Sequence, residues 1–327
     1  MSDNRQLRWA VLGTGVIANE MAAALQRMGR RLDAVGNRTP EKAAAFGKKY
    51  GVRKVYEDYR QMFTDPEIDA IYITTPHNTH MAFLEAALSH GKHVLCEKSI
   101  TLNSEELGRA ARLARENHVV LGEAMTIYHM PIYRLLRERL ASGALGRVNL
   151  VQLNFGSFKD YDMGNRFFSR SLAGGAMLDI GVYALSLARL FLESTPDQMQ
   201  SFVRMAPTGV DESAVLIMAN REGQMVSATL SLHSRQPKRA VISCEKGYIE
   251  IMEYPRADEA LIVDAETGAA QRIQAGRKED ALRYEIADME AAAAGEGDML
   301  LSHTAEVMEL MTCLRRTWGV TYPEEET

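Results

Sequence analysis

The sequence predicts an α/β fold, with a doubly wound parallel sheet in the N-terminal part and an α+β domain with a mainly antiparallel sheet after it. The chain has 327 residues, more than one hydrophobic core usually fills, so two domains are expected. Up to residue 125, short apolar runs alternate with helical patterns, which is typical of parallel βαβ units. After residue 147, strand patterns follow one another with hairpin signals between them. We predict domains at residues 1–123 and 124–327.

The first domain repeats a strand followed by a helix. The strands are buried apolar runs, and two helices have clear start signals: Thr39 with Pro40, and Asn103. The expected strands are 7–13, 32–37, 68–76, 92–98 and 119–125, with a short strand and helix in 54–63. The expected helices are 16–28, 39–51, 78–91 and 103–117. Such alternation predicts a parallel sheet with helices on both faces.

The second domain is expected to consist mostly of strands joined by short turns. The strand patterns lie within 148–158, 200–206, 213–234, 239–252 and 260–273, with the turn signals REGQ, EKGY and ETGA inside the last three. Helical patterns cover 174–191, 280–294 and 303–318. This mixture predicts an α+β domain.

Composition excludes several classes of function. The net charge of −5 argues against a nucleic-acid partner, which needs clustered Lys and Arg. Cys96, Cys244 and Cys313 are too few for a disulfide framework and form no metal-binding pattern, so no metal is expected. The N-terminal stretch is polar and leads straight into a strand pattern, and no apolar run is long enough to span a membrane. We expect a soluble, cytoplasmic protein.

A glycine-rich turn lies between the first strand and the first helix. It reads Gly13-Thr14-Gly15-Val16-Ile17-Ala18, a GxGxxA pattern. The glycines permit a tight turn and close approach of the backbone, and the helix N-terminus attracts a pyrophosphate. In this position the pattern predicts a Rossmann domain that binds a nicotinamide or flavin dinucleotide. A plain turn would leave the second glycine poorly explained.

The end of the second strand bears on the choice between NAD and NADP. An acid is expected there in an NAD-binding domain, because it binds the ribose 2′-hydroxyl. Here the strand ends Gly36-Asn37-Arg38-Thr39, and Arg38 and Thr39 suit a 2′-phosphate. The residues favour NADP over NAD. Alternatively, Arg38 is a turn residue stacked on adenine, which fits either cofactor.

Two sets of polar residues are candidates for catalysis. Glu97 and Lys98 end a buried strand, where open parallel sheets bind ligands, so Lys98 could transfer a proton and Glu97 could orient ribose or lysine. Asp179 and Tyr183 are spaced i, i+4, which places both on one face of an apolar helical segment. Such groups are costly to bury unless they are bonded. A structural pair that caps local backbone is the alternative.

Four stretches together resemble the Gfo/Idh/MocA family, which includes glucose–fructose oxidoreductase and inositol dehydrogenase. They are GTGVIA at 13–18, TTPHNTH at 74–80, KHVLCEK at 92–98 and GGAMLDIGVY at 174–183. The resemblance covers nearly the whole chain and implies NAD(P)-dependent oxidation or reduction of sugars, polyols or diols. It also implies a second domain with a large open sheet that is often used to form homo-oligomers. Within the family, the chain is similar to the dihydrodiol and xylose dehydrogenase branch.

The resemblance also assigns roles to residues. Lys98 matches the family's lysine, Asp179 its helix aspartate and Tyr183 the His or Tyr four residues later; either Tyr183 or Lys98 would transfer the proton, and Asp179 would orient the substrate hydroxyls or the lysine. Residues expected at the cofactor are Gly13, Gly15, Val16, Ile17, Asn37, Arg38, Thr39, Thr75, Pro76, His77, His80, Glu97 and Lys98. Apart from the resemblance, Arg166 and Tyr128 are candidate substrate contacts, with surface or packing roles as the alternative.

Two departures from the family pattern limit what is carried over. Ser99 replaces the usual proline after the Glu-Lys pair, which is expected to loosen that loop. The stretch at 123–131 lacks the tryptophan and arginine of the dihydrodiol branch and has Tyr128 and His129 instead, so the substrate of those relatives is not transferred. Two other functions stay open: a glycoside hydrolase that uses the cofactor transiently, and a sensor that binds dinucleotide without catalysis.

Overall fold

The computed structural model describes residues 6–326, and its contacts separate the chain into two compact units. The first unit holds the chain up to Ala124 together with Leu282–Leu301. The second holds Met125–Ala281 and the residues from Ser302 onward. The predicted domain boundary at 123/124 stays a prediction. The two units differ from the predicted domains mainly in Leu282–Leu301, which belongs to the first unit.

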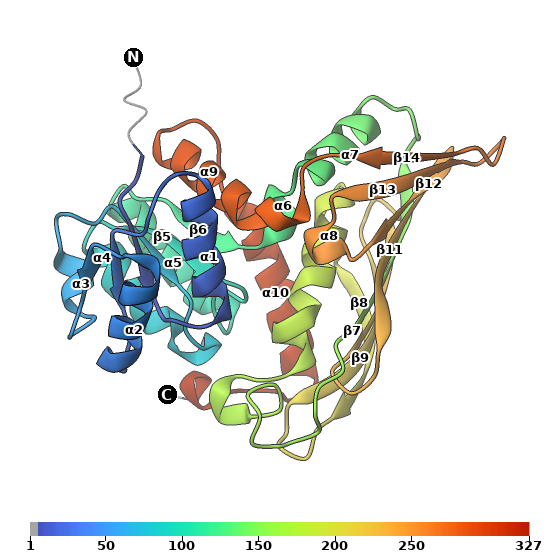
Figure 1. The fold of residues 1–327 in the computed structure, drawn as a ribbon. Coiled ribbons are helices and arrows are strands. Elements are labelled where there is room, and N and C mark those ends of the chain that lie inside the picture. Colours follow the sequence, from blue (N-terminus) through green and yellow to red (C-terminus); the bar gives the residue numbers. More distant parts are fainter. Residues whose placement is uncertain (1–5, 327) are drawn as a thin grey trace. The chain divides into compact units, whose positions relative to one another are not determined.

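Six parallel strands form the sheet of the first unit, in the spatial order β3-β2-β1-β4-β5-β6 (Figure 1). They are β1 Trp9–Leu12, β2 Ala34–Gly36, β3 Lys54–Val55, β4 Ala70–Ile73, β5 His93–Glu97 and β6 Leu121–Ala124. All their pairings are parallel, which confirms the predicted doubly wound sheet. The strand order reverses direction between β1 and β4, which is the place at which doubly wound sheets bind ligands.

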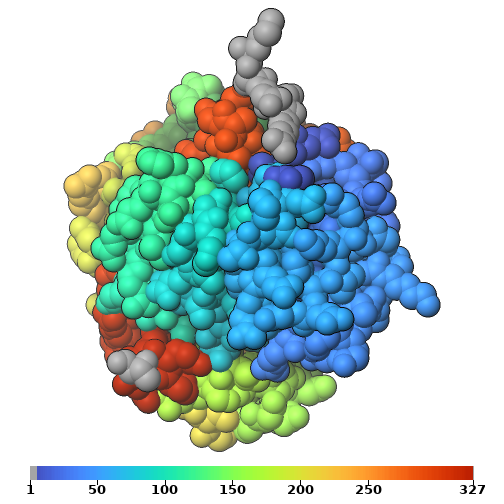
Figure 2. All heavy atoms as spheres, turned by 90° about the vertical axis from the view of Figure 1, so that its left-hand side faces the viewer, coloured from blue at the N-terminus to red at the C-terminus, as the bar shows by residue number. Residues whose placement is uncertain are grey.

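The helices of the first unit cover this sheet. They are α1 Val16–Arg27, α2 Pro40–Tyr50, α3 Gln61–Thr64, α4 His80–Ser89, α5 Ser104–Glu116 and most of α9, Ala281–Ala293. Helix α9 comes from the far end of the chain, and its apolar residues join the core around Trp9. Its Glu290 accepts a hydrogen bond from the Trp9 indole (3.0 Å) and pairs with Arg30 (2.7 Å). Figure 2 shows the side of this unit on which α3 and α4 lie, packed into a continuous surface.

The second unit is built on a sheet of eight strands, in the order β14-β13-β12-β11-β7-β10-β9-β8 (Figure 1). They are β7 Val148–Gly156, β8 Gln198–Met205, β9 Asp211–Ala219, β10 Met225–Ser231, β11 Gln236–Cys244, β12 Gly247–Met252, β13 Glu259–Asp264 and β14 Ala270–Gln274. Only β7 and β10 pair in parallel; the other pairings are antiparallel, which confirms the mainly antiparallel sheet.

The helices of the second unit include two that the sequence analysis did not predict. The helices are α6 Thr126–His129, α7 Pro131–Ala141, α8 Val182–Phe191 and α10 Leu301–Thr317. The two unpredicted helices are α6 and α7. The expected helix at 174–191 begins with a π-helical turn, η3, Met177–Gly181, before α8. Figure 1 shows α8 and α10 beside one face of the sheet. Among residues 6–326, only Arg170–Phe191 has the length and apolarity of a membrane span, and 83% of its apolar window is buried in the protein, as in a core helix.

A buried carboxylate stabilises the edge of the first sheet, and its loss should be measurable. Asp65 accepts hydrogen bonds from Lys54, Tyr56 and the Glu67 N–H (2.8 Å). Burial alone would raise the pKa of Asp65, but these hydrogen bonds outweigh burial and hold the pKa well below its usual range. The carboxylate therefore stabilises the fold above the ordinary Asp pKa of about 3.9, and this contribution is lost as the pH falls through the lowered pKa.

We expect Asp65→Asn to lower the free energy of unfolding at pH 7 by about 1–3 kcal/mol, because charge-assisted hydrogen bonds are lost. The difference from the parent should shrink below about pH 4, because Asp65 of the unfolded parent is protonated there while the folded carboxylate is still ionised. Urea unfolding in a Trp318→Phe background checks this, since buried Trp9 then reports on the first unit alone. An equal difference at pH 7 and pH 3 would contradict this electrostatic account.

Candidate active site

The glycine turn after β1 contains one glycine that the fold requires and one that it does not. Gly13 has a φ of +110°, and a Cβ there would lie 2.5 Å from Thr74 Oγ1. Gly15 has an ordinary φ of −73°, and a Cβ there would meet no atom within 4 Å. The space beyond Gly15 is therefore open at the N-terminus of α1, whose first turn carries no acid. This geometry fits the close approach of a pyrophosphate.

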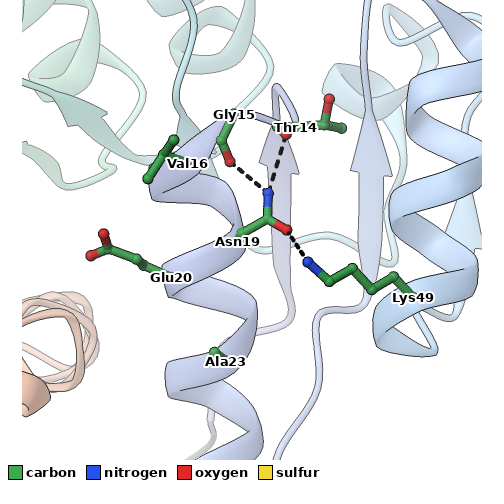
Figure 3. Close-up of a pocket in the computed structure, with 7 residues that line it drawn as sticks. All are labelled: Thr14, Gly15, Val16, Asn19, Glu20, Ala23 and Lys49. Carbon is green, nitrogen blue, oxygen red and sulfur yellow. Dashed lines mark hydrogen bonds between the residues drawn. The ribbon is translucent and has the colours of Figure 1, made fainter.

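Asn19 holds the glycine turn in place, and the sequence analysis did not identify it. Its side-chain Nδ2 donates to the carbonyl oxygens of Thr14 (3.2 Å) and Gly15 (2.7 Å), and its Oδ1 accepts from Lys49 Nζ and Tyr50 Oη (both 2.8 Å). Figure 3 shows Asn19 pointing at the turn from inside α1. The turn, Asn19 and Lys49 border a surface hollow of about 630 Å³, which is lined by Thr14, Gly15, Val16, Asn19, Glu20, Ala23 and Lys49.

The loop after β2 joins the glycine turn through Asn37. Its Nδ2 donates to Thr14 Oγ1 (2.8 Å), and its Oδ1 accepts from the Thr39 N–H (2.8 Å). The Arg38 side chain is exposed and makes no ion pair with any residue from 6 to 326. Its guanidinium is therefore available to a ligand beside the turn.

Two histidines tie the loop after β4 to the loop after β5. His77 Nε2 lies 3.0 Å from the carbonyl oxygen of Lys98. His80 is fully buried, with Nδ1 3.0 Å from the Ser99 carbonyl oxygen and Nε2 2.8 Å from that of Thr75. Burial lowers the pKa of His80 and so disfavours its imidazolium form. His80 holds the loops together, and its predicted contact with a cofactor stays a prediction.

The loop after Lys98 is held in place despite Ser99. Ser99 is fully buried, and the Ile100 N–H donates to the carboxylate of Glu123 (3.1 Å), which is itself buried at the end of β6. On the other side of Lys98, Tyr72 on β4 donates a hydrogen bond to Glu97. Neighbouring strands thus supply hydrogen bonds on both sides of Lys98, and the expected loosening of this loop stays a prediction.

The structure brings the predicted cofactor residues to one edge of the first sheet. They follow four adjacent strands, β2, β1, β4 and β5, at their carboxyl ends, where open parallel sheets bind ligands. Asn37 contacts Thr14 of the glycine turn, the turn packs on Thr74, and the loops after β4 and β5 meet at the two histidines. Val16, Ile17, Thr75 and Pro76 lie in the same loops and helix start. Their contact with a cofactor stays a prediction.

In the second unit, Asp179 and Tyr183 lie on one helical segment, as predicted, but the segment is not a regular α-helix. Asp179 is in the π-turn η3, in which the Val182 N–H bonds to the Met177 carbonyl oxygen five residues back. Asp179 is largely buried, and the Arg166 guanidinium lies 3.9 Å from its carboxylate. The Tyr183 ring packs on Phe155 of β7, with ring centres 5.7 Å apart. A carboxylate, a phenol and a cation thus belong to one part of this unit.

Two other candidates from the sequence lie on the short helix α6. The rings of Tyr128 and of His303 on α10 meet edge to face with their centres 6.3 Å apart, and His129 is buried. Their contact with substrate stays a prediction. Among residues 6–326, no group of three or more His, Cys, Asp or Glu side chains is arranged to hold a metal ion.

Comparison with known proteins identifies the family to which the two parts of the chain are similar. Residues 7–125 match an oxidoreductase family with an NAD-binding Rossmann fold, and residues 133–250 match the GFO/IDH/MocA C-terminal domain. The chain is 28% identical over 342 residues to a trans-1,2-dihydrobenzene-1,2-diol dehydrogenase of Mus musculus, which covers 98% of this chain and 99% of the relative. It is 30% identical over 261 residues to the Xenopus laevis enzyme of the same name, covering 79% and 78%.

Solved structures show the same fold at lower identity. Levoglucosan dehydrogenase in complex with NADH and levoglucosan has a TM-score of 0.87 at 19% identity, covering 96% of this chain and 98% of that one. The 3-ketoreductase KijD10 from Actinomadura kijaniata, in complex with NADP and TDP-benzene, has a TM-score of 0.84 at 22% identity, covering 95% and 98%. With the glycine turn, the Glu-Lys pair and both domain matches in place, the chain belongs to the Gfo/Idh/MocA family of NAD(P)-binding oxidoreductases.

Proposed function

We propose that the protein is a dehydrogenase or reductase that uses NADP(H) to interconvert a CH–OH group and a carbonyl group in a diol or sugar. The observation that carries the proposal is the row of loops after β2, β1, β4 and β5, which contact one another and end at Lys98. The names of the relatives, which are dehydrogenases of a cyclic diol and of a sugar derivative, support the substrate class.

In this proposal, each polar residue has a stated task. The nicotinamide would supply or accept the hydride. Lys98 or Tyr183 would move the proton at the substrate oxygen, and Lys98 would also stabilise negative charge that develops there. Asp179, held near Arg166, would accept hydrogen bonds from a neighbouring substrate hydroxyl. The glycine turn, fixed by Asn19, would position the pyrophosphate.

Preference for NADP rests on Arg38. Its exposed guanidinium is free of ion pairs within the described chain and follows β2, where a 2′-phosphate would lie. We expect Arg38→Ala to weaken NADPH binding by about 10- to 100-fold and NADH binding by much less, because a charge-assisted hydrogen bond contributes about 1.5–3 kcal/mol. Titration of nicotinamide fluorescence measures both affinities. Equal losses of affinity for NADPH and NADH would show that Arg38 does not determine the preference for NADP.

A direct assay tests the proposed reaction. The purified protein would be incubated with NADP⁺ and cyclic trans-diols, pentoses or anhydrosugars, and with NADPH and the matching carbonyl compounds, while absorbance at 340 nm is followed. A net change with one substrate class supports the proposal. Glycoside cleavage without a net change would indicate the hydrolase, and cofactor binding with no turnover of any compound would indicate the sensor.

We also propose that the protein forms homo-oligomers through the outer face of the second sheet and acts in the reducing cytoplasm. Phe202 on β8 is 82% exposed and pairs with Val215 on β9, and Ile217 on the same face is 57% exposed. Met225 on β10 extends this apolar surface. A second copy of the chain is the occupant that the family resemblance implies, and burying such a surface is favourable.

We expect Ile217→Lys to shift the sedimentation coefficient from that of an oligomer to that of a monomer, because the lysine would bury a charge at the interface. Lys246→Ala, on the exposed turn between β11 and β12, is the matched control. A parent protein that already sediments as a monomer would refute the proposal.

A further inference from the structure

A buried carboxylate in the second unit contacts the start of the turn that carries Asp179. Asp211, at the beginning of β9, has no exposed surface. Its Oδ2 accepts a hydrogen bond from the Met177 N–H (2.6 Å), the first residue of the π-turn η3. Its Oδ1 faces Gly175, where a Cβ would come within 2.4 Å. A residue 34 positions from Met177 in sequence therefore fixes the backbone two residues before Asp179.

The C-terminal segment supports the same turn from another direction. Tyr322 is fully buried and donates from its hydroxyl to the carbonyl oxygen of Gly174 (2.6 Å). Its backbone N–H donates to Glu325 (2.9 Å), which is in turn paired with the buried Arg315 of α10 (2.9 Å). The Arg315 guanidinium also lies over the Tyr322 ring, 4.7 Å from its centre. One polar cluster thus contacts both glycines: Tyr322 bonds to Gly174, and Asp211 packs against Gly175.

The turn that these residues hold has a shape that needs support. In η3 the hydrogen bonds run between residues five apart, and π-helical turns are rare and often found at functional sites. Gly175 has a φ of +120°, a backbone conformation that residues other than glycine rarely adopt. The Asp179 N–H donates a hydrogen bond to the Gly175 carbonyl oxygen (3.2 Å). The direction of the Asp179 side chain therefore depends on where Gly175 and Met177 are placed.

We propose that Asp211, with Tyr322, is a positioning residue for the reaction, which sets the turn Gly174–Gly181 so that Asp179 and Tyr183 face the substrate. Neither residue touches the substrate itself. The inference rests on the proposed function, because it assumes that Asp179 and Tyr183 act on substrate.

The charge of Asp211 bears on how firmly the turn is held. Burial raises its pKa to about 7, although the Met177 N–H and the Arg315 guanidinium favour the ionised form. The other titratable groups in this cluster are Tyr322 and Glu325 from the C-terminal segment. The neighbouring Glu212 pairs with Arg204 and Tyr161 instead. An ionised carboxylate is the stronger acceptor, so the bond to Met177 weakens as the pH falls below about 7.

The experiment compares Asp211→Asn and Tyr322→Phe with the full-length parent, and uses Asp197→Asn, an exposed aspartate of the same unit, as the matched control. Hydrogen exchange of the backbone amides of residues 174–183, followed by mass spectrometry, is the readout that needs no substrate. We expect faster exchange there in both variants, with NADPH affinity and Tm close to those of the parent. Exchange equal to that of the parent in both variants would overturn the inference.

Kinetics test the link to catalysis. We expect kcat to fall about 100-fold in Asp211→Asn, because a misplacement of about 1 Å costs that much, and about 5-fold in Tyr322→Phe, which loses one hydrogen bond. The loss in Asp211→Asn should largely vanish in an Asp179→Asn background, since residues that act together are not additive. The kcat of the parent should decrease as the pH falls below about 7. The kcat of Asp211→Asn should not show this decrease.

The outcomes separate this inference from the proposed function. If Asp179→Asn leaves kcat unchanged while exchange in the turn responds to Asp211→Asn, the catalytic assignment fails and the support of the turn stands. If Asp179→Asn lowers kcat while Asp211→Asn and Tyr322→Phe do not, the positioning role is wrong. Parallel losses of kcat, Tm and NADPH affinity in Asp211→Asn would show a general structural role and overturn it as well.

Discussion

Replacing Lys98 by methionine should lower kcat by about 10²- to 10⁴-fold, the range that a positioned proton donor or acceptor contributes. Lys98 follows the buried strand β5, and its carbonyl oxygen is near His77, while Ser99 is fixed by contacts of its own. The loop should therefore keep its shape when the side chain is changed, and cofactor affinity should change little. Steady-state kinetics together with NADPH titration measure the two effects separately.

Lys42→Met is the control for Lys98→Met, because Lys42 is an exposed lysine on α2 in the same unit. It should leave kcat and NADPH affinity as in the parent. Lys98→Arg keeps the charge but not a transferable proton, and should stay as inactive as Lys98→Met if proton transfer is the task. Full activity in Lys98→Met would leave Tyr183 as the proton-transfer candidate.

Replacing Gly15 by alanine should abolish tight dinucleotide binding without harming the fold. The backbone at Gly15 suits any residue, and its Cβ would point into open space. A pyrophosphate in that space would collide with the methyl group, and overpacking of about 1–3 kcal/mol corresponds to about 10- to 100-fold in Kd. Thermal unfolding should show an unchanged Tm, and titration with NADPH should show the weaker binding.

Gly13→Ala gives the opposite result and serves as the internal comparison. Its φ of +110° and the 2.5 Å approach to Thr74 Oγ1 strain any side chain in the free protein. We expect Tm to fall, with or without cofactor. If Gly15→Ala bound NADPH as tightly as the parent, the pyrophosphate would have to lie elsewhere.

The fold of the first unit could be predicted closely because its signals are local. Apolar runs mark the strands, and caps such as Asn103, whose side chain accepts from the Glu106 N–H, mark the helices. Helix α7 has a comparable signal in Pro131 at its first turn, although it is absent from the predicted elements. The return of α9 to the first unit has no local signal, since it depends on which core accepts its apolar face.

The residues of the candidate site also fall into two groups, those that the sequence could predict and those that it could not. The glycines, Lys98, Asp179 and Tyr183 could be found because their residue types and spacing carry meaning without tertiary structure. Asn19, Glu123 and Asp211 could not, because their roles come from hydrogen bonds to backbone that is distant or buried. The π-turn at Asp179 was also hidden, since the letters of 174–183 read equally well as an ordinary helix.

The return of α9 has a consequence for how the protein is made. A nascent chain that has emerged only as far as Ala124 has all six strands of the first sheet, but lacks Leu282, Ile286 and Met289 from its core. It also lacks Glu290, the partner of the Trp9 indole and of Arg30. During synthesis, the dinucleotide-binding unit must therefore wait, with an apolar area uncovered, until more than 150 further residues have left the ribosome.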